Sequence, residues 1–176
     1  MLNKKNILDK FNNIDDKMLI ARVLDKAVNA EKSRTVTWTD FLDPYQIRLV
    51  ERALSGTNDI EYRFEGGYKG AERKIAIFEP DHLSNLSEKG SENPLSLINI
   101  KLKRENNITH RDYLGSLMGL GIKREKIGDI IVEGSSCDVI VLKDIADYIL
   151  YNLNKVSNTG VWVSKGNIDN LKVPEP

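Results

Sequence analysis

Apolar residues recur at helical spacing near the start of the chain. The spacing predicts a short helix over residues 3–11, followed by a longer helix that Asp15 or Asp16 caps and that continues to about Lys32. One face of the longer helix should be buried, since four apolar residues recur there every three or four positions. These residues are Ile20, Leu24, Ala27 and Val28.

A third helix should begin at Asp43 and Pro44, because aspartate favours the capping position and proline the first helical position. Gly56 is expected to end it, after an apolar stripe made of Ile47, Val50, Ala53 and Leu54. Strand-like segments occur at residues 35–39, 60–64 and 74–78, and a loop with three glycines, residues 65–73, joins the last two as a hairpin. Residues 1–80 are therefore expected to form a small N-terminal α+β domain.

Residues 81–94 are rich in Ser, Glu and Asn and have prolines near both ends, which is typical of a linker between domains. The pattern beyond it predicts alternating strands and helices. The expected elements are a strand at 95–103, a helix from Thr109 to Gly119 or Gly121, strands at 129–133 and 138–142, a helix marked by Ile145, Ile149, Leu153 and Val156, and a strand at 161–163. This βαββαβ order over residues 95–170 predicts a ferredoxin-like, RRM-like domain with both helices on one face of the sheet. Residues 171–176 read as a tail.

Composition narrows the class of protein. The 176 residues are 40% hydrophobic and 30% charged, which indicates a soluble globular protein, and no apolar run is long enough to cross a bilayer. The single cysteine, Cys137, allows no intrachain disulfide and no cysteine-based metal site, and we expect a half-buried residue at a strand edge. The lack of a visible secretory signal and of disulfides favours a cytoplasmic location and no membrane partner.

Charge is balanced overall but uneven along the chain. Twenty-six basic and 26 acidic residues give a net charge of zero, which argues against binding nucleic acid through bulk charge. Between Lys101 and Lys126, however, seven basic residues meet three acidic ones, and the next stretch to Leu142 holds three acidic residues only. We therefore expect a local basic face, in which the elbow at residues 121–126 lies near Lys101, Lys103 and Arg104.

Three segments are candidates for contact with RNA phosphates. The basic elbow presents Lys123, Arg124 and Lys126; the hairpin loop presents Lys69, Arg73 and Lys74, with Tyr68 as a ring on which a base could stack; the helix start at His110 and Arg111 offers backbone N–H groups to a phosphate. Each has an ordinary structural alternative: a solvated face, a turn that needs positive φ, and a helix N-terminus. The two central strands carry no aromatic residue, so charge and shape are expected to do most of any RNA binding.

The chain offers no set of catalytic residues. His110-Arg111-Asp112 has the first letters of the kinase catalytic loop, but the asparagine and the glycine-rich loop of that motif are missing. The hairpin glycines lack the Gly-Lys-Ser/Thr of a phosphate-binding P-loop. No nucleophile, base and orienting group can be assembled, so we expect neither an enzyme nor a cofactor or metal.

Four segments of the chain resemble the YlmH family, which consists of bacterial S4-domain RNA-binding proteins encoded with the cell-division cluster. These segments are residues 109–130, residues 66–74, Phe41-Leu42-Asp43-Pro44 and the strand that begins at Asp129. The resemblance implies an N-terminal α+β region, a ferredoxin-like RNA-binding domain and a C-terminal S4 domain. It also implies binding to structured RNA, ribosomal RNA or tRNA, on the large ribosomal subunit during rescue of stalled translation, with no enzymatic activity. Since the chain stops at Pro176, where the S4 domain would begin, we expect a natural or artificial truncation.

The expected function is thus non-catalytic, ribosome-associated RNA binding, without DNA specificity. A protein-interaction module is the alternative, because a βαββαβ sheet has an open face and two edge strands with which a partner could pair. A regulatory domain that binds a small ligand has the same topology and would predict a homodimer. Steep loss of binding with salt distinguishes phosphate contacts from an apolar interface.

Overall fold

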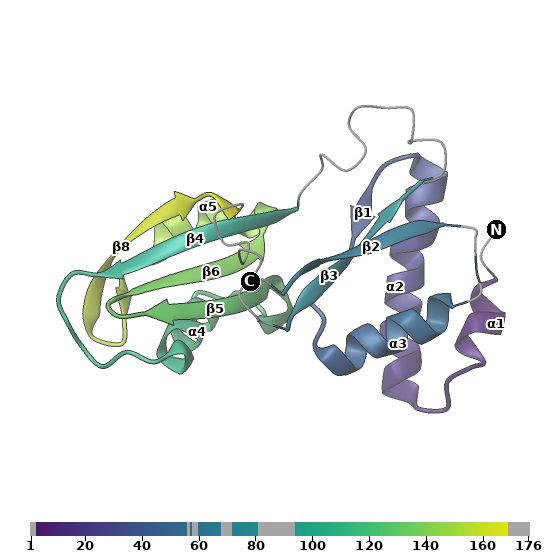
Figure 1. The fold of residues 1–176 in the computed structure, drawn as a ribbon, viewed down its shortest axis with the longest axis horizontal. Helices are drawn as coiled ribbons and strands as arrows, with labels where there is room; N and C mark the ends of the chain where they lie inside the picture. Colours follow the sequence, from purple (N-terminus) through teal and green to yellow (C-terminus); the bar gives the residue numbers. More distant parts are fainter. Residues whose placement is uncertain (1–2, 56, 58–59, 68–71, 81–93, 169–176) are drawn as a thin grey trace, which may run out of the picture. The chain divides into compact units, whose positions relative to one another are not determined.

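The structure, a computed structural model, describes residues 3–55, 57, 60–67, 72–80 and 94–168 (Figure 1). The described residues divide into two compact units: the first holds most of residues 3–80, and the second holds residues 94–168 together with residues 66, 67 and 72. The expected linker at 81–93 and the tail from residue 169 lie outside the described residues, and the expected domain boundaries stay predictions. Within the described part, no helix has the length and apolar character needed to cross a bilayer.

The first unit packs helices against a small sheet. Its elements are α1 (Lys4–Leu8), α2 (Ile14–Ser33), β1 (Thr37–Trp38), α3 (Pro44–Leu54), β2 (Glu61–Gly66) and β3 (Lys74–Glu79). The strands lie in the order β1-β3-β2, with β1 and β3 antiparallel. The core joins Ile20 and Leu24 of α2, Val50 of α3 and Phe78 of β3, all with no exposed surface. The apolar stripes read from the sequence therefore do face the core.

The start of α2 corrects one prediction. Asn13, not Asp15 or Asp16, caps the helix: its side-chain oxygen accepts the N–H of Asp15 at 2.8 Å and of Asp16 at 3.2 Å. An asparagine oxygen satisfies these donors as well as a carboxylate does, and the two aspartates then lie in the first turn, where the helix dipole favours negative charge. The cap expected at Asp43 is confirmed, since its side chain accepts the N–H of Gln46 at 2.8 Å.

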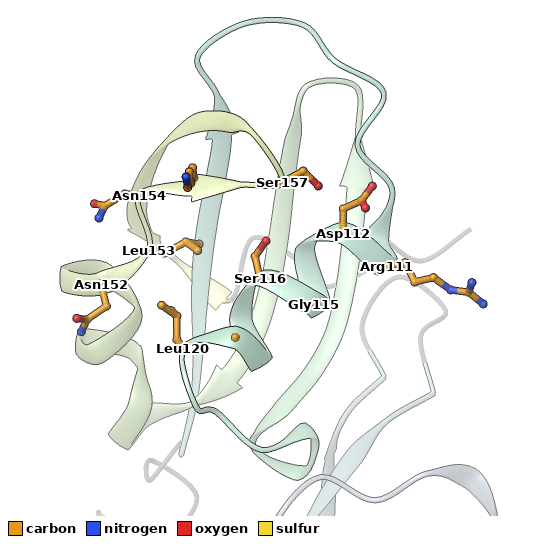
Figure 2. Close-up of a pocket in the computed structure, with 11 residues that line it drawn as sticks. Arg111, Asp112, Gly115, Ser116, Leu120, Asn152, Leu153, Asn154 and Ser157 are labelled. Atoms are coloured by element: carbon orange, nitrogen blue, oxygen red, sulfur yellow. The ribbon is translucent and has the colours of Figure 1, made fainter.

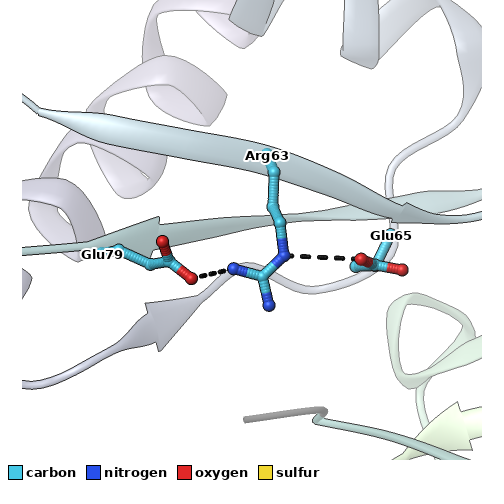
Figure 3. A network of polar contacts seen from close by, with 3 residues as sticks. All are labelled: Arg63, Glu65 and Glu79. Atoms are coloured by element: carbon cyan, nitrogen blue, oxygen red, sulfur yellow. Dashed lines mark hydrogen bonds and ion pairs between the residues drawn. The ribbon is translucent and has the colours of Figure 1, made fainter. Parts of the chain in front are cut away.

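A partly buried ion pair joins β2 to β3. The guanidinium of Arg63 contacts the carboxylate of Glu79 through Nη1, and its Nε donates to Glu65 Oε1 at 3.4 Å (Figure 3). Glu79 is only 6% exposed, so the nearby cation offsets the cost of burying its charge. Glu65 shares the same arginine, so one cation serves two carboxylates at the base of the hairpin.

The second unit is built on one antiparallel sheet. Its elements are β4 (Leu95–Leu102), α4 (His110–Gly119), the short 3-10 turn η3 (Arg124–Lys126), β5 (Ile127–Glu133), β6 (Ser136–Leu142), α5 (Lys143–Asn152), β7 (Lys155–Val156) and β8 (Thr159–Gly166). The strands lie in the order β5-β6-β4-β8-β7. Without the two-residue β7, this is the strand order of a ferredoxin-like unit. The expected α+β fold is confirmed.

Both helices of the second unit cover one face of its sheet. Tyr113 and Leu117 of α4 and Ile149 of α5 belong to the same core cluster as Ile98 of β4 and Val139 of β6. Alternate strand residues point to opposite faces, so the neighbours of these core residues lie on the other face of the sheet. We call that second face, opposite α4 and α5, the outer face.

The end of α5 corrects a second prediction. Leu153 and Val156, expected in a continuous helix, lie beyond its last residue, and Val156 belongs to β7. Both are buried, as the apolar spacing requires. The chain leaves the helix at Leu153 in an extended conformation and turns back into β8 at Ser157, which has a φ of +53°. Spacing of three and four residues therefore identified buried positions here but not their secondary structure.

Candidate nucleic-acid interface

The start of α4 exposes two of the predicted contact residues. The Asp112 carboxylate accepts the Thr109 N–H at 2.8 Å and the Thr109 hydroxyl at 3.1 Å, which confirms the expected capping box. The backbone hydrogen bond from Thr109 lowers the pKa of Asp112 below its ordinary value. His110 and Arg111 lie exposed in the first turn. The cap keeps this turn ordered and leaves their side chains in solvent.

A hollow of about 540 Å³ lies beside α4, and the segment that follows α5 forms its other wall (Figure 2). Arg111 borders it, but in Figure 2 its guanidinium points away from the other lining side chains. Gly115 and Gly119 contribute bare backbone on the α4 side, with open space where a Cβ would stand. The hollow is open, and its lining mixes polar and apolar side chains.

The basic elbow, residues 121–126, has an ordered backbone. Gly121 adopts a φ of +94°, which glycine tolerates, and its N–H donates to the Met118 carbonyl at 2.9 Å. Ile122 is buried, and the Lys126 N–H donates to the Lys123 carbonyl at 3.0 Å. The cations of the elbow therefore project from a defined turn, which lowers the entropy lost when they bind an anion.

The three elbow cations differ in their surroundings. Lys123 is exposed, whereas Lys126 is half-buried. The guanidinium of Arg124 turns back on its own chain, where Nη1 donates to the carbonyls of Ile127 at 2.6 Å and Gly128 at 3.4 Å. Arg124 thus holds the junction between η3 and β5, and Lys123 is the elbow cation most accessible to a partner.

The cations of the hairpin serve the fold of the first unit. Arg73 donates to the Phe41 carbonyl at 3.4 Å, and Lys74 exchanges backbone hydrogen bonds of 2.7 and 3.2 Å with Leu42. Both side chains are half-buried. Tyr68 and Lys69, the other two residues predicted here, lie outside the described residues. The structure thus gives Arg73 and Lys74 a structural role, whether or not they also contact RNA.

The expected proximity of the elbow to Lys101, Lys103 and Arg104 is wrong. Ile127, which follows the elbow, pairs with Val141 of β6, whereas Lys101 pairs with Ser136. Ser136 and Val141 lie at opposite ends of β6, about 17 Å apart along an extended strand. The basic residues that are close in sequence are therefore distributed between two ends of the sheet.

Trp162 is a candidate that the sequence reasoning missed. It lies on β8 directly opposite Lys101 of β4, and it is 56% exposed. Its neighbour Val161 is buried in the core, so Trp162 faces the outer side of the sheet. The alternation of Val161-Trp162-Val163 carried this signal, but only the strand order shows that β8 adjoins the basic end of β4.

The surroundings of the single cysteine differ from the expectation. Cys137 is fully buried on the inner strand β6, where a half-buried edge position was expected, and burial raises the pKa of its thiol to about 12. A thiol of that pKa is protonated at neutral pH and is a poor nucleophile. Within the described ranges, no three His, Cys, Asp or Glu side chains gather as a metal site would require.

Fold and surface together define a two-unit α+β protein whose second unit is an RRM-like domain with exposed basic residues. Comparison with protein families agrees with this class. Residues 15–82 match the family described as "YlmH, N-terminal", and residues 90–170 match the "Putative RNA-binding domain in YlmH". The chain belongs to the YlmH family, which confirms the resemblance read from its motifs.

Two relatives show how far the similarity extends. The chain is 31% identical over 161 residues to the ribosome-associated protein quality control protein P2 of Bacillus subtilis (strain 168), and the match covers 91% of this chain. It spans 61% of the length of that relative. The cell division protein ylmH from Streptococcus pneumoniae has a similar solved structure, with a TM-score of 0.71 at 20% identity, covering 93% of this chain and 98% of the other. The second match shows the shared fold.

Proposed function

We propose that this chain is a non-catalytic RNA-binding protein that acts on the large ribosomal subunit in quality control of stalled translation, with a link to cell division. The match of residues 90–170 to a family RNA-binding domain carries the proposal. The similarity to the ribosome-associated quality control protein of Bacillus subtilis supports the ribosomal part of the proposal. The ordered basic elbow and the exposed start of α4 are compatible with phosphate binding.

Within this proposal, the elbow is the main phosphate contact in the second unit. Lys123 is exposed on a turn that Arg124 braces from inside, so its ammonium can donate charge-assisted hydrogen bonds to phosphate oxygens. Lys126 adds a second cation from the same turn. His110 and Arg111 lie at the other end of α4, about 15 Å away along a ten-residue helix, a distance that spans a few nucleotides of backbone. Arg73 and Lys74 of the first unit complete the proposed set, together with Tyr68 and Lys69 of the hairpin loop.

The test is co-sedimentation with purified large ribosomal subunits over a series of salt concentrations. Replacing both Lys123 and Lys126 by glutamate should weaken binding and lower the slope of log affinity against log salt by about 1 for each phosphate that the variant no longer binds. The matched control is the double variant Lys26→Glu/Lys32→Glu, which reverses two exposed charges of α2 and changes the net charge by the same amount. The proposed elbow is wrong if the elbow variant and the control behave alike.

Arg124→Ala separates folding from binding. It should destabilise the second unit by about 1–2 kcal/mol, because two backbone carbonyls lose a half-buried charged donor. Lys123→Ala should leave unfolding unchanged and affect binding only. Binding that does not respond to salt would instead favour the protein-interaction module, in which a partner pairs with a sheet edge.

A further inference from the structure

One end of the outer face combines an exposed indole with two lysines. Trp162 of β8 is 56% exposed and stands opposite Lys101 of β4. Lys103, two residues further along the same side, places its ammonium 5.8 Å from the centre of the indole ring. Lys101 and Lys103 are both exposed. The three side chains therefore form a compact cluster, which we call the Trp162 site.

The indole contributes little to the core of the second unit. The adjacent residues Val161 and Val163 pack against the core cluster, and Lys165 pairs with Asp147 of α5 at 2.8 Å on the helix-covered face. Trp162 points to the opposite face of the strand, and more than half of its surface meets solvent. A large aromatic ring held at a fixed strand position offers a face on which a flat ring can stack, and the two cations beside it attract anionic groups.

We propose that the Trp162 site binds an unpaired RNA base, which stacks on the indole, while Lys101 and Lys103 hold the flanking phosphates. This inference rests on the proposed RNA-binding function and adds a second contact to it. RRM-like sheets bind single-stranded RNA by stacking bases on exposed aromatic rings. Here the two central strands lack aromatics, and the ring stands on β8, which pairs with central β4.

Charge favours RNA over a protein partner at this site. The residue pair next along the same face, Asn99 and Ser164, is polar, and the Asn99 amide donates to the Asp138 carboxylate at 2.9 Å. Asp138 keeps its negative charge, but it lies opposite Asn99 and not opposite Lys101, whereas the two lysines lie beside the indole. An aromatic ring flanked by cations matches the alternating bases and phosphates of a single strand.

The Trp162 site and the basic elbow can be tested separately, because Lys101 pairs with one end of β6 and Ile127, which follows the elbow, pairs with the other end. The probes are single-stranded hexa-adenylate and hexa-uridylate. They carry the same charge, but adenine stacks more strongly than uracil, so a difference between them reports stacking. The full chain carries one other tryptophan, Trp38, so a Trp38→Phe background makes Trp162 the only indole reporter. Adenylate should quench its fluorescence more than uridylate does.

Affinity measured by anisotropy of a labelled adenylate completes the experiment. Trp162→Ala should weaken binding roughly tenfold, the loss expected for one stacked base, whereas Trp162→Phe should retain most of the affinity. Tyr151→Ala is the control: this ring is 84% exposed on α5, which covers the other face of the sheet. Unchanged circular dichroism confirms that each variant folds.

Each outcome distinguishes the two proposals. If Trp162→Ala binds adenylate as tightly as the parent chain, or if adenylate leaves the Trp162 fluorescence unchanged, the stacking site is wrong, whatever the ribosome assay shows. If adenylate quenches Trp162 but the chain does not sediment with large subunits, the stacking site stands and the proposed ribosomal function fails. Equal loss of affinity in Trp162→Ala and Tyr151→Ala would also overturn the site.

Discussion

The hydroxyl of Tyr113 leads to a prediction of increased stability. This side chain is fully buried in the core of the second unit, and among the described residues its hydroxyl has no hydrogen-bond partner. Burial raises its pKa to about 12, as expected for a phenol held away from water. Folding therefore removes the hydroxyl from water without replacing its hydrogen bonds.

Replacing Tyr113 by phenylalanine removes this cost. A buried, unsatisfied hydroxyl costs about 1–3 kcal/mol, and the small void left by one oxygen atom offsets part of the gain. We expect a net stabilisation of about 1 kcal/mol, which for a unit of this size raises the melting temperature by about 4–8 °C. Urea unfolding followed by circular dichroism, together with calorimetry, measures both quantities.

Tyr148→Phe is the matched control with the opposite sign. The Tyr148 hydroxyl donates to the Leu120 carbonyl at 2.7 Å, and the ring is 47% exposed. Its removal should destabilise the chain by no more than about 1 kcal/mol, since solvent can replace the missing hydrogen bond. A Tyr113→Phe variant less stable than the parent chain would refute the reasoning, because it would show that the hydroxyl has a partner in solution.

Two further predictions concern titration. Burial raises the pKa of the Cys137 thiol from 9.0 to about 12, so the folded chain should not react with Ellman's reagent at pH 8 and should react once urea unfolds it. Because the folded state holds the thiol proton more tightly than the unfolded state does, the free energy of unfolding should fall as pH rises from about 9 towards 12. The pKa of Asp112 is shifted in the opposite direction, downwards. Its pKa lies below 3.8, so its capping bonds contribute stability at neutral pH that is lost as pH falls below that value; Asp112→Ala should flatten the acid limb of a stability profile measured by urea unfolding.

The basic residues show how far sequence reasoning reached. The elbow itself was predicted correctly as a basic turn after a helix that ends on glycine, because Gly121 and the capping box act over three or four neighbouring residues. Its grouping with Lys101 and Lys103 was wrong. Those residues are 20 or more positions from Lys123 in sequence, and the order of strands between them decides their separation.

The role of each cation also depended on the folded chain. Arg124 and Lys123 are adjacent and chemically similar in the sequence, yet one braces two carbonyls and the other is exposed. The position of Trp162 likewise depended on the folded chain. Its alternation with two valines held a signal for an outward direction that was not used, and its pairing with Lys101 required the register of β8 against β4.

The sequence by itself determined the α+β class, the βαββαβ order, the caps at Asp43 and Thr109 and most of the buried positions. These depend on periodicity and on contacts within one turn, which local residues specify. Only the tertiary structure decided which charges share a surface, that β7 replaces the end of a helix, and that an exposed indole adjoins two lysines. Such groupings arise from pairing between distant strands, and a shift of register by one residue would turn Trp162 into the core.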